Sequence, residues 1–429
     1  METSEIFDGL LENLKVDNSK AIADRRDEIV KALNKEFRSA DGVVSYRLMV
    51  GSFGRFTATR GISDLDLLFF LPASIRGDYK DEAGPERLLR RVRRTLKDRY
   101  PRTEVRVDQC IVVVQFTDFK FEVQPVFENK DRSFSHPDTH LKRWRTTKPR
   151  AEIEAMQIRD RETSGNLRNL CRMARAWKNS HGVVMGGLLM DTLAYNFFKD
   201  ATEYEKAKTS SYDLIVRDFF EFLSEEEDHE YYAALGSGQR VYVKRPFQRR
   251  AKKAYKLCLE AIEAEGKSAV NQKWKAVFGR PVPSAKSIQA SQDARSFKDT
   301  EEFIEDYFPV DIRYSLRIDC RVTQNGFRPQ QLSAMRKSRL PLLPQKELDF
   351  TVQDCDVPQP FQLKWKVLNR GFEAERRDDI RGQIIASSQD RTRHERSAFR
   401  GDHYVECYAI KDGVVVARDR ILVPITPQG

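Results

Sequence analysis

The chain has 429 residues, of which 40% are hydrophobic and 33% are charged, and its formal net charge at pH 7 is +10. This length gives room for two or three domains with ordinary cores, and the basic balance suits a polyanionic ligand such as a nucleotide or a nucleic acid. No segment reaches the ~20 apolar residues of a membrane span, and the N-terminus METSEIFDGL lacks a basic-then-apolar signal pattern. The six cysteines are scattered singly, which favours reduced thiols over disulfides or zinc. We therefore expect a cytoplasmic protein with no membrane partner.

The first third of the chain predicts helices followed by a sheet. Two helices are expected over SEIFDGLLENLKV and NSKAIADRRDEIVKALNKEFR, where apolar residues recur with helical spacing. A further helix is expected at Pro85–Arg99, and strands are expected around Tyr46–Val50, Leu65–Phe70, Glu104–Gln115 and Phe119–Phe127. Together these elements predict a mixed sheet with helices on one face.

Helices dominate the next segment, and strands dominate the last one. The helical pattern is clearest at Arg168–Ser180, Gly187–Asp200, Tyr212–Glu226 and Pro246–Glu265. Residues 278–299 are polar, Ser-rich and contain two prolines, which indicates a linker or lid. Alternating β-branched runs then predict a small β-sandwich. The predicted fold class is α+β, with a catalytic lobe at 1–150, a helical lobe at 151–283, a linker at 284–300 and a β-rich domain at 301–429.

The segment VGSFGRFTATRGISDLDLLFFLP, residues 50–72, carries the clearest chemistry. Asp64 and Asp66 are two apart at the head of a strand, so their side chains share a face. Paired carboxylates suit two Mg²⁺ (or Mn²⁺) ions, which can stabilise the attacking and leaving oxygens of a phosphoryl displacement. The Gly51-Ser52 turn before them can offer backbone N–H groups and a hydroxyl to phosphates. The alternative is a solvated strand end beside an ordinary loop.

A third carboxylate, Glu122, lies in the next predicted strand, three residues before Pro125. A neighbouring strand can bring Glu122 beside the Asp pair, where it would complete the metal site or take the proton from an attacking sugar hydroxyl. The alternative is an outward-facing strand residue, and alternation decides between the two only weakly.

This pattern resembles the polymerase-β-like nucleotidyltransferases, and within them the bacterial CD-NTases related to cyclic GMP-AMP synthase and oligoadenylate synthase. The matching pieces are Gly51-Ser52, Asp64-Leu65-Asp66, FEVQPVF, SFSHPDT, WRTTKP and NLRNLCRMARAWKNSHG followed by GGLLMDTLAYNFF. They cover about two-thirds of the chain. Many members carry Asp where this chain has Glu122, and the extra methylene alters the reach of the carboxylate.

The resemblance implies an activity and a set of site residues. It implies that ribonucleoside triphosphates, ATP among them, are joined into a cyclic oligonucleotide with release of pyrophosphate, as a second messenger that reaches a downstream effector in anti-phage defence. A nucleotide or nucleic-acid activator is also implied. Asp64, Asp66 and Glu122 would hold two metal ions, and the donor triphosphate would contact Arg175, two residues before a helix Trp, or the nearby Lys178. Relatives usually carry Lys at the position of Arg175.

The last third resembles the nucleotide-sensor domain fused to some of these bacterial synthases, through FQLKWKVLNRGFEA, DDIRGQI and HERSAFRGDHYVECYAIKDGVVVARDRILV. An aromatic can stack a base, Asn and Glu can read base edges, and Arg can hold phosphate. The candidate ligand residues are Trp365, Asn369, Arg381, Arg400, His403 and Glu406. The alternative is that Trp365 is a core residue of the sandwich and the arginines lie on its surface.

Three other interpretations stay open at this level. A linear oligonucleotide product would use the same site. A template-independent RNA nucleotidyltransferase would bind RNA with a steep salt dependence, and the basic runs at 87–99 and 244–256 could serve that role, although each also fits a solvated helix face. A non-catalytic nucleotide-binding regulator is disfavoured, because three clustered carboxylates are costly to keep without metal ions.

Overall fold

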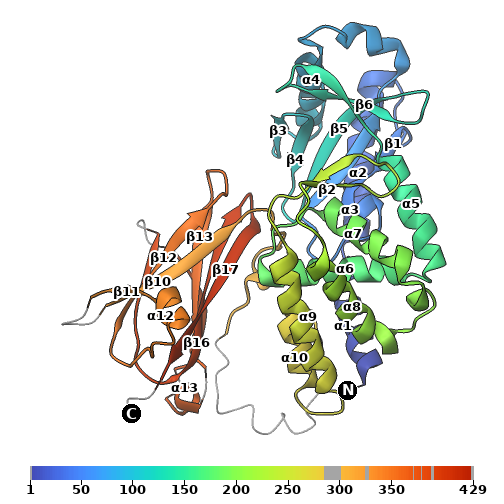
Figure 1. The fold of residues 1–429 in the computed structure, drawn as a ribbon. Coiled ribbons are helices and arrows are strands. Elements are labelled where there is room, and N and C mark those ends of the chain that lie inside the picture. The colour runs from blue at the N-terminus through green and yellow to red at the C-terminus, as the bar shows by residue number, and fades with distance from the viewer. Residues whose placement is uncertain are drawn as a thin grey trace. The chain divides into compact units, whose positions relative to one another are not determined.

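The computed structural model describes residues 2–284, 301–323, 328–370, 372–377, 379–387 and 391–426. They form two compact units, which are described separately (Figure 1). One unit comprises Met1–Trp177 and Met185–Pro283, and the other comprises Lys178–Val184 and Ser284–Gly429. Apart from Ser284, the predicted linker at 284–300 lies outside the described residues, and the predicted division of the first unit into two lobes stays a prediction.

The sheet of the first unit has the strand order β1 (Arg47–Met49), β2 (Asp64–Phe70), β5 (Lys120–Glu128), β4 (Ile111–Gln115) and β3 (Glu104–Asp108), with β6 (Phe134–Asp138) and β7 (Arg143–Thr147) continuing from β5. Strands β2 and β5 are parallel, and the other pairs are antiparallel. The predicted mixed sheet is therefore confirmed. The single strand predicted over Glu104–Gln115 was wrong, because the chain reverses at Gln109, where φ is 44°, and forms the β3–β4 hairpin.

Helices α2 (Ser19–Arg38) and α4 (Gly84–Arg99) pack against one face of this sheet. Their apolar residues share one core with the odd-numbered residues of β2, Leu65, Leu67 and Phe69, and with Phe121 and Val123 of β5. Because side chains alternate along a strand, the even-numbered residues of β2 and β5 lie on the opposite face. This alternation places the polar residues of both strands on the side away from α2 and α4.

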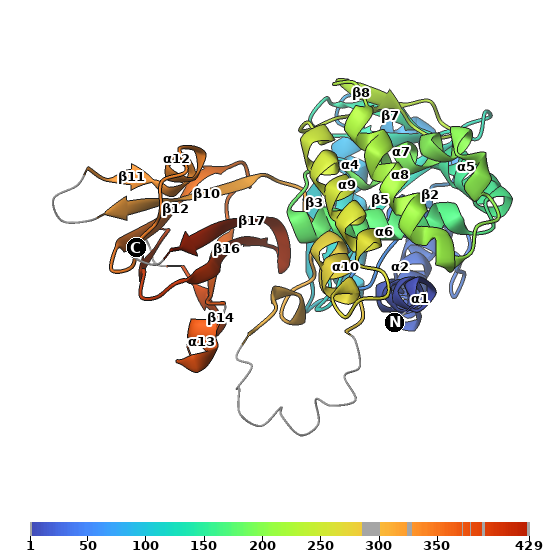
Figure 2. The same cartoon turned by 60° about the horizontal axis from the view of Figure 1, so that its bottom comes forward.

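The rest of the first unit is mainly helical. Its helices are α1 (Thr3–Leu14), the short α3 (Gly51–Gly54), α5 (Pro149–Glu162), α6 (Asn166–His181, which belongs to this unit up to Trp177), α7 (Gly187–Asp200), α8 (Tyr212–Glu225), α9 (Gln248–Glu263) and α10 (Val270–Phe278). The predictions for α6 to α9 agree within two residues at each end. Helices α8, α9 and α10 lie side by side (Figure 2). The rings of Phe7 and Trp274, 4.9 Å apart, join α1 to α10. A small hairpin of β8 (Tyr231–Ala233) and β9 (Arg240–Tyr242) precedes α9.

The second unit is a sandwich of two antiparallel sheets, which confirms that prediction. One sheet has the order β11 (Gln330–Gln331), β10 (Leu316–Thr323), β12 (Glu347–Cys355) and β15 (Thr392–Arg396). The other has the order β14 (Arg381–Ala386), β13 (Gln362–Leu368), β16 (Gly401–Lys411) and β17 (Val414–Ile425). Both sheets contribute to one core, which includes Phe350, Trp365 and Cys407. Short helices α12 (Leu332–Lys337) and α13 (Phe372–Arg376) lie in its connections.

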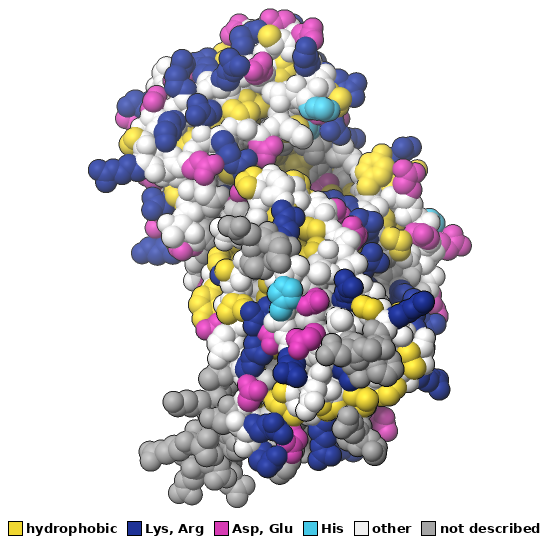
Figure 3. All heavy atoms as spheres, turned by 90° about the vertical axis from the view of Figure 1, so that its left-hand side faces the viewer, with side chains coloured by type: hydrophobic (Ala, Val, Ile, Leu, Met, Phe, Trp, Pro, Cys, Tyr) yellow, Lys and Arg dark blue, Asp and Glu magenta, His cyan; other side chains and the backbone are white. Residues whose placement is uncertain are grey.

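The surface charges are mixed in sign. On the face shown in Figure 3, Lys and Arg side chains alternate with acidic and apolar ones instead of forming one continuous basic field. In the basic run on α4, Arg90 pairs with Glu86, and Arg91 pairs with Glu36 of α2, which favours a solvated helix face there. Among the described residues, no helix combines the length and the apolar content needed to cross a bilayer.

Candidate active site

The register of β2 and β5 places the three predicted carboxylates together. Asp66 is paired with Glu122, and Asp64 with Lys120, across the parallel β2–β5 ladder. Paired residues of neighbouring strands lie about 5 Å apart, and all four side chains point to the face away from α2 and α4. The sequence therefore brings Asp64, Asp66 and Glu122 to one small area of the sheet surface, as predicted.

The Gly51-Ser52 turn lies directly against Asp66. The Val50 N–H donates a hydrogen bond of 2.9 Å to the Asp66 carbonyl, and the chain then turns into α3 with a φ of 62° at Gly51. A Cβ at position 51 would lie 1.8 Å from Asp66 Oδ2. Only glycine satisfies both the positive φ and this close approach, so the backbone N–H groups of the turn are held beside the carboxylates.

Lys120 lies among the carboxylates. Its Nζ is 2.8 Å from Glu122 Oε1 and 3.6 Å from Asp64 Oδ1, and its side chain is 11% exposed. The oxygen donors on this face are of the type that Mg²⁺ and Mn²⁺ prefer. In their present positions, however, the side chains of the described residues contain no group of three or more His, Cys, Asp or Glu residues arranged for a metal ion. The carboxylate oxygens and the strand register therefore fit a divalent ion. In this structure the Lys120 ammonium lies between two of the three carboxylates.

A buried network of ion pairs holds the residues that follow the Gly51-Ser52 turn. Asp191 of α7 has no exposed surface; its Oδ2 accepts hydrogen bonds from Arg55 Nε (2.8 Å) and Thr57 Oγ1 (2.9 Å), and its Oδ1 accepts one from Arg175 (2.6 Å). Burial alone would raise the pKa of Asp191, but the guanidinium groups of Arg175 and Arg55 more than offset it and hold that pKa at about 2. The carboxylate thus stays ionised and ties α7 and α6 to the residues that follow α3.

Glu152 of α5 also belongs to this network, but its charge is less well compensated than the charge of Asp191. Its carboxylate lies 3.4 Å from the Arg55 guanidinium and accepts a hydrogen bond from the Ser237 hydroxyl. Burial raises the pKa of Glu152, and Arg55 and Ser237 offset this only in part.

The buried contacts of Arg175 differ from the predicted contact with a triphosphate. Its guanidinium also donates to the carbonyls of Cys171 and Gly187, and the residue is 7% exposed. The contact of Arg175 with a triphosphate stays a prediction. Its buried hydrogen bonds give Arg175 a second role, which is to hold the surrounding fold in place. Lys178, the alternative, belongs to the second unit, where its Nζ lies 2.8 Å from Asp311 Oδ1.

Two further arginines of α6 were missed in the sequence. Arg168 Nε donates to the Arg55 carbonyl at 3.0 Å, and Arg172 donates to the Phe56 carbonyl at 2.9 Å. Arg168, Arg172 and Arg175 follow one another at spacings of four and three residues, which places them on one helix face. This spacing in the sequence could have indicated that one face of α6 carries arginines. In the structure Arg168 and Arg172 contact the loop after the Gly-Ser turn.

Two family matches account for most of the chain. Residues 1–160 match the Second Messenger Oligonucleotide or Dinucleotide Synthetase (SMODS) domain, and residues 298–426 match the Adenylyl/Guanylyl and SMODS C-terminal sensor domain. The chain is a SMODS-type nucleotidyltransferase with a fused sensor domain. The predicted enzyme class, the nucleotidyltransferase core and the β-rich C-terminal domain are thereby confirmed.

Solved structures with similar folds have low sequence identity to this SMODS nucleotidyltransferase. CdnC of Escherichia coli MS115-1 with ATP is 15% identical, with 66% of this chain and 99% of that chain covered and a TM-score of 0.49. E. coli DncV with 3′-deoxy GTP is 14% identical over 64% and 94%, with a TM-score of 0.47. The CdnE c-UMP-AMP synthase of Rhodothermus marinus is 14% identical over 60% and 95%, with a TM-score of 0.43. A comparison with curated proteins finds no match.

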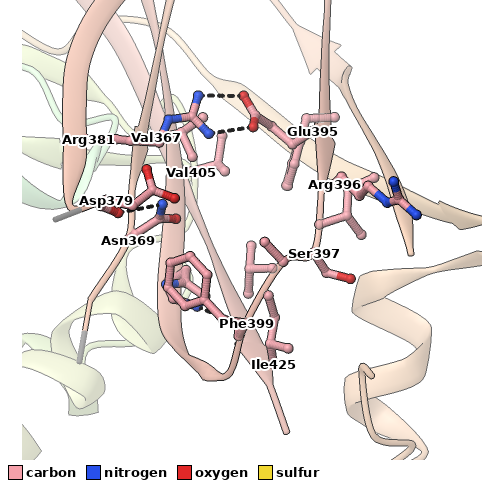
Figure 4. A pocket seen from close by; sticks show the side chains of 15 residues that line it. Val367, Asn369, Asp379, Arg381, Glu395, Arg396, Ser397, Phe399, Val405 and Ile425 are labelled. Atoms are coloured by element: carbon pink, nitrogen blue, oxygen red, sulfur yellow. Dashed lines mark hydrogen bonds and ion pairs between the residues drawn. The ribbon is translucent and has the colours of Figure 1, made fainter. Parts of the chain in front are cut away.

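The sensor domain contains a pocket of about 100 Å³ between its two sheets, and three predicted ligand residues, Asn369, Arg381 and His403, line it. At its edge, Arg381 of β14 forms a two-pronged ion pair of 2.6 and 2.9 Å with Glu395 of β15 (Figure 4). These are edge strands of opposite sheets, so the pair links the sheets across the pocket. Burial would raise the pKa of Glu395, but Arg381 holds it below its usual value.

Hydrogen bonds fix the other two predicted ligand residues that line the pocket. Asn369 Nδ2 donates to the Asp379 carbonyl at 2.9 Å. His403 Nδ1 accepts from the Arg370 N–H at 3.0 Å, so Nε2 carries the proton and donates to the Phe399 carbonyl. Burial lowers the pKa of His403, and the Phe399 carbonyl offsets this in part.

The remaining three predicted residues do not line this pocket. Trp365 is fully buried in the sandwich core, and its Nε1 donates to the Ser387 hydroxyl. Its position therefore agrees with the alternative that Trp365 is a core residue. Arg400 is exposed. Glu406 lies on the other face of its sheet, buried, and pairs with Arg418 and Arg420.

Proposed function

We propose that this SMODS nucleotidyltransferase joins ribonucleoside triphosphates, ATP among them, into a cyclic oligonucleotide. The supporting observation is the β2–β5 register, which sets Asp64, Asp66 and Glu122 side by side against the Gly51-Ser52 turn. The synthetase family of residues 1–160 supports the same activity. In each transfer the acceptor hydroxyl oxygen bonds to the α-phosphorus of the donor, the bond to pyrophosphate breaks, and the hydroxyl proton leaves.

The roles of the residues follow from their chemistry. Asp64, Asp66 and Glu122 would hold two divalent ions, Mg²⁺ or Mn²⁺, which when bound stabilise charge on the attacking and leaving oxygens. Glu122 is the carboxylate that we assign to assist in accepting the hydroxyl proton. The Ser52 hydroxyl and the Gly51-Ser52 backbone orient the donor phosphates. Arg175 keeps the turn in place through Asp191, and the triphosphate contact is assigned to either Arg175 or Lys178, as the family resemblance implies.

The test is an incubation of the full chain with Mg²⁺ or Mn²⁺ and all four ribonucleoside triphosphates. Products are treated with phosphatase and analysed by mass spectrometry, with the Asp64→Asn/Asp66→Asn protein as control. A phosphatase-resistant oligonucleotide without a terminal phosphate, absent in the control, is expected. A phosphatase-sensitive ladder would indicate the linear product instead. The absence of any product that depends on the two aspartates, in the presence of nucleotide and nucleic-acid activators, would contradict the proposal.

We also propose that the product serves anti-phage defence as a second messenger for a downstream effector. The family description of the synthetase domain supports a messenger role. Bacteria carrying this enzyme with its neighbouring genes should form fewer phage plaques than those carrying the doubly substituted protein. Equal plaque numbers would contradict this role.

For the sensor domain, we propose that the pocket lined by Asn369, Arg381 and His403 holds one part of a nucleotide, its base or a phosphate, because a volume of about 100 Å³ is too small for the whole molecule. Its support is the convergence of three predicted residues on one pocket in a domain of the sensor family. Titration of the full chain with ATP, GTP and the enzyme's own product, followed calorimetrically, should show binding that Arg381→Lys weakens at least about tenfold. The exposed Arg400→Lys is the matched control and should bind like the unmodified chain. Equal effects of the two substitutions would contradict the proposed pocket.

A further inference from the structure

Lys120 has an environment that the catalytic assignment leaves unexplained. It is the first residue of β5, opposite Asp64 in the register. Its Nζ lies 2.8 Å from Glu122 Oε1 and 3.6 Å from Asp64 Oδ1. A largely buried ammonium is stable only when carboxylates or other acceptors surround it. The position of this lysine is therefore set by two of the three carboxylates that would hold metal ions.

The converse also holds, because the carboxylates need a cation. Asp64, Asp66 and Glu122 lie on neighbouring strand positions, and like charges at this separation repel one another in a partly buried site. One ammonium between Asp64 and Glu122 relieves part of that repulsion without any bound ion. Its ammonium lies beside two of the carboxylates that would hold a divalent ion, and among the described residues no group of three or more His, Cys, Asp or Glu side chains is arranged for a metal ion.

We propose that Lys120 is a resident cation of this site, which neutralises Asp64 and Glu122 when no divalent ion is bound and is displaced when one binds. This inference rests on the proposed metal-dependent function. Lys120 is thus a positioning residue that sets how tightly the site holds its metal, because each binding event includes the cost of moving the ammonium away.

The side chain is suited to such an exchange. The backbone of Lys120 is held by the hydrogen bond of 2.8 Å from its N–H to the Ser63 carbonyl, and its ammonium is held by the ion pairs with Glu122 and Asp64. Lysine carries a point charge on a four-carbon stem with several rotatable bonds. Displacement therefore needs a rotamer change and no movement of the strand.

The chain offers a matched control in the sensor domain. Lys366 is 2% exposed and also lies between two carboxylates, with its Nζ 2.7 Å from Glu301 Oε1 and 3.8 Å from Glu406 Oε2. Removing either ammonium breaks comparable ion pairs, but only Lys120 is beside the proposed metal ligands.

The test compares Lys120→Met and Lys366→Met in the full chain. Mn²⁺ affinity is measured from the electron paramagnetic resonance signal of free Mn²⁺, and the melting temperature is measured in EDTA and in Mn²⁺. We expect Lys120→Met to bind Mn²⁺ about tenfold more tightly, to melt at a lower temperature in EDTA, and to gain more from Mn²⁺ than the unmodified chain does. Lys366→Met should lower the melting temperature equally in both conditions, and Lys120→Arg, which keeps the charge, should bind Mn²⁺ no more tightly than the unmodified chain.

The results that overturn the inference are separate from those that overturn the proposed function. Unchanged or weaker Mn²⁺ binding by Lys120→Met, or an equal loss of stability in EDTA and Mn²⁺, would show that Lys120 is only a structural residue. If Lys120→Met fails to fold, the same criteria apply to Lys120→Gln. If the Asp64→Asn/Asp66→Asn protein binds Mn²⁺ as tightly as the unmodified chain, the proposed metal site itself fails, whatever Lys120→Met does.

Discussion

Replacing Asp191 by Asn tests whether the buried network holds the nucleotidyl-transfer site in place. Asn keeps the shape of the side chain, but it turns an NH₂ group toward one of the two guanidinium groups, Arg55 or Arg175, and leaves both without a buried counter-charge. A pKa of about 2 in place of 3.8 corresponds to about 2.4 kcal/mol of folding stability at neutral pH. Removing one partner of a buried ion pair typically costs about 3–5 kcal/mol. We therefore expect a loss of about 2.5–4 kcal/mol.

The assay is urea denaturation at pH 7, followed by tryptophan fluorescence. Trp144, Trp177 and Trp274 lie in the first unit and Trp365 in the second, so the transition of the first unit should move to lower urea. Pyrophosphate release should also fall, because the turn after β1 loses its support from α7. A loss below about 1 kcal/mol would refute the assigned role of the network.

Asp213→Asn provides the matched control for this substitution. Asp213 is also a buried aspartate on a helix of the first unit, but burial raises its pKa, and the backbone N–H of Leu214 offsets this only in part. Because its charge is unfavourable in the folded state, removing it should leave the stability unchanged or slightly higher. A large loss from Asp213→Asn would contradict this electrostatic reasoning.

Single contacts lead to three further predictions. Gly51→Ala should reduce pyrophosphate release at least about a hundredfold, because its Cβ would collide with Asp66 at a positive φ; near-normal rates would contradict the close approach of the turn to Asp66. Asp191 and Glu406 both have folded-state pKa values lowered to about 2, so their stabilisation should be complete above about pH 5 and should be lost as the pH falls from about 4 to 2, measured as urea midpoints across that range. Glu395→Gln should lower the melting temperature of the sensor domain, since its guanidinium partner on β14 loses a counter-charge, and an unchanged melting curve would contradict the link between the sheets.

Local patterns in the sequence predicted much of the fold. Helix α7 agrees with its predicted bounds at both ends, because a glycine pair, Gly186-Gly187, marks its start and apolar residues continue through it. The pairing of Asp66 with Glu122 was foreseen only as one of two alternatives, because alternation along a strand gives the face of a side chain and not the register between two strands. The hairpin at Gln109 was missed, because a two-residue reversal between β-branched runs resembles one long strand.

The ion-pair partners could not be predicted, because they are distant in sequence. Arg55 and Asp191 are 136 residues apart, and Arg55 and Glu152 are 97 apart. Each of these residues, taken alone, is typical of a solvated surface. Only the packing of α3 against α7 makes them a buried cluster. The triphosphate contact of Arg175 was implied by the family resemblance and stays a prediction, whereas its ion pair with Asp191 had no signal in the sequence.

The two cation clusters of the first unit differ in a way that follows from the choice of side chain. Asp191 is held by two arginines, whose planar, permanently charged groups make several directed hydrogen bonds and suit a contact that does not change. Glu122 is held by a single lysine, whose compact charge on a flexible stem can leave without disturbing the backbone. An arginine at position 120 would form more directed bonds to the same carboxylates and would compete more strongly with a divalent ion. Lysine at this position is therefore the residue expected where the carboxylates need a counter-charge that the metal can replace.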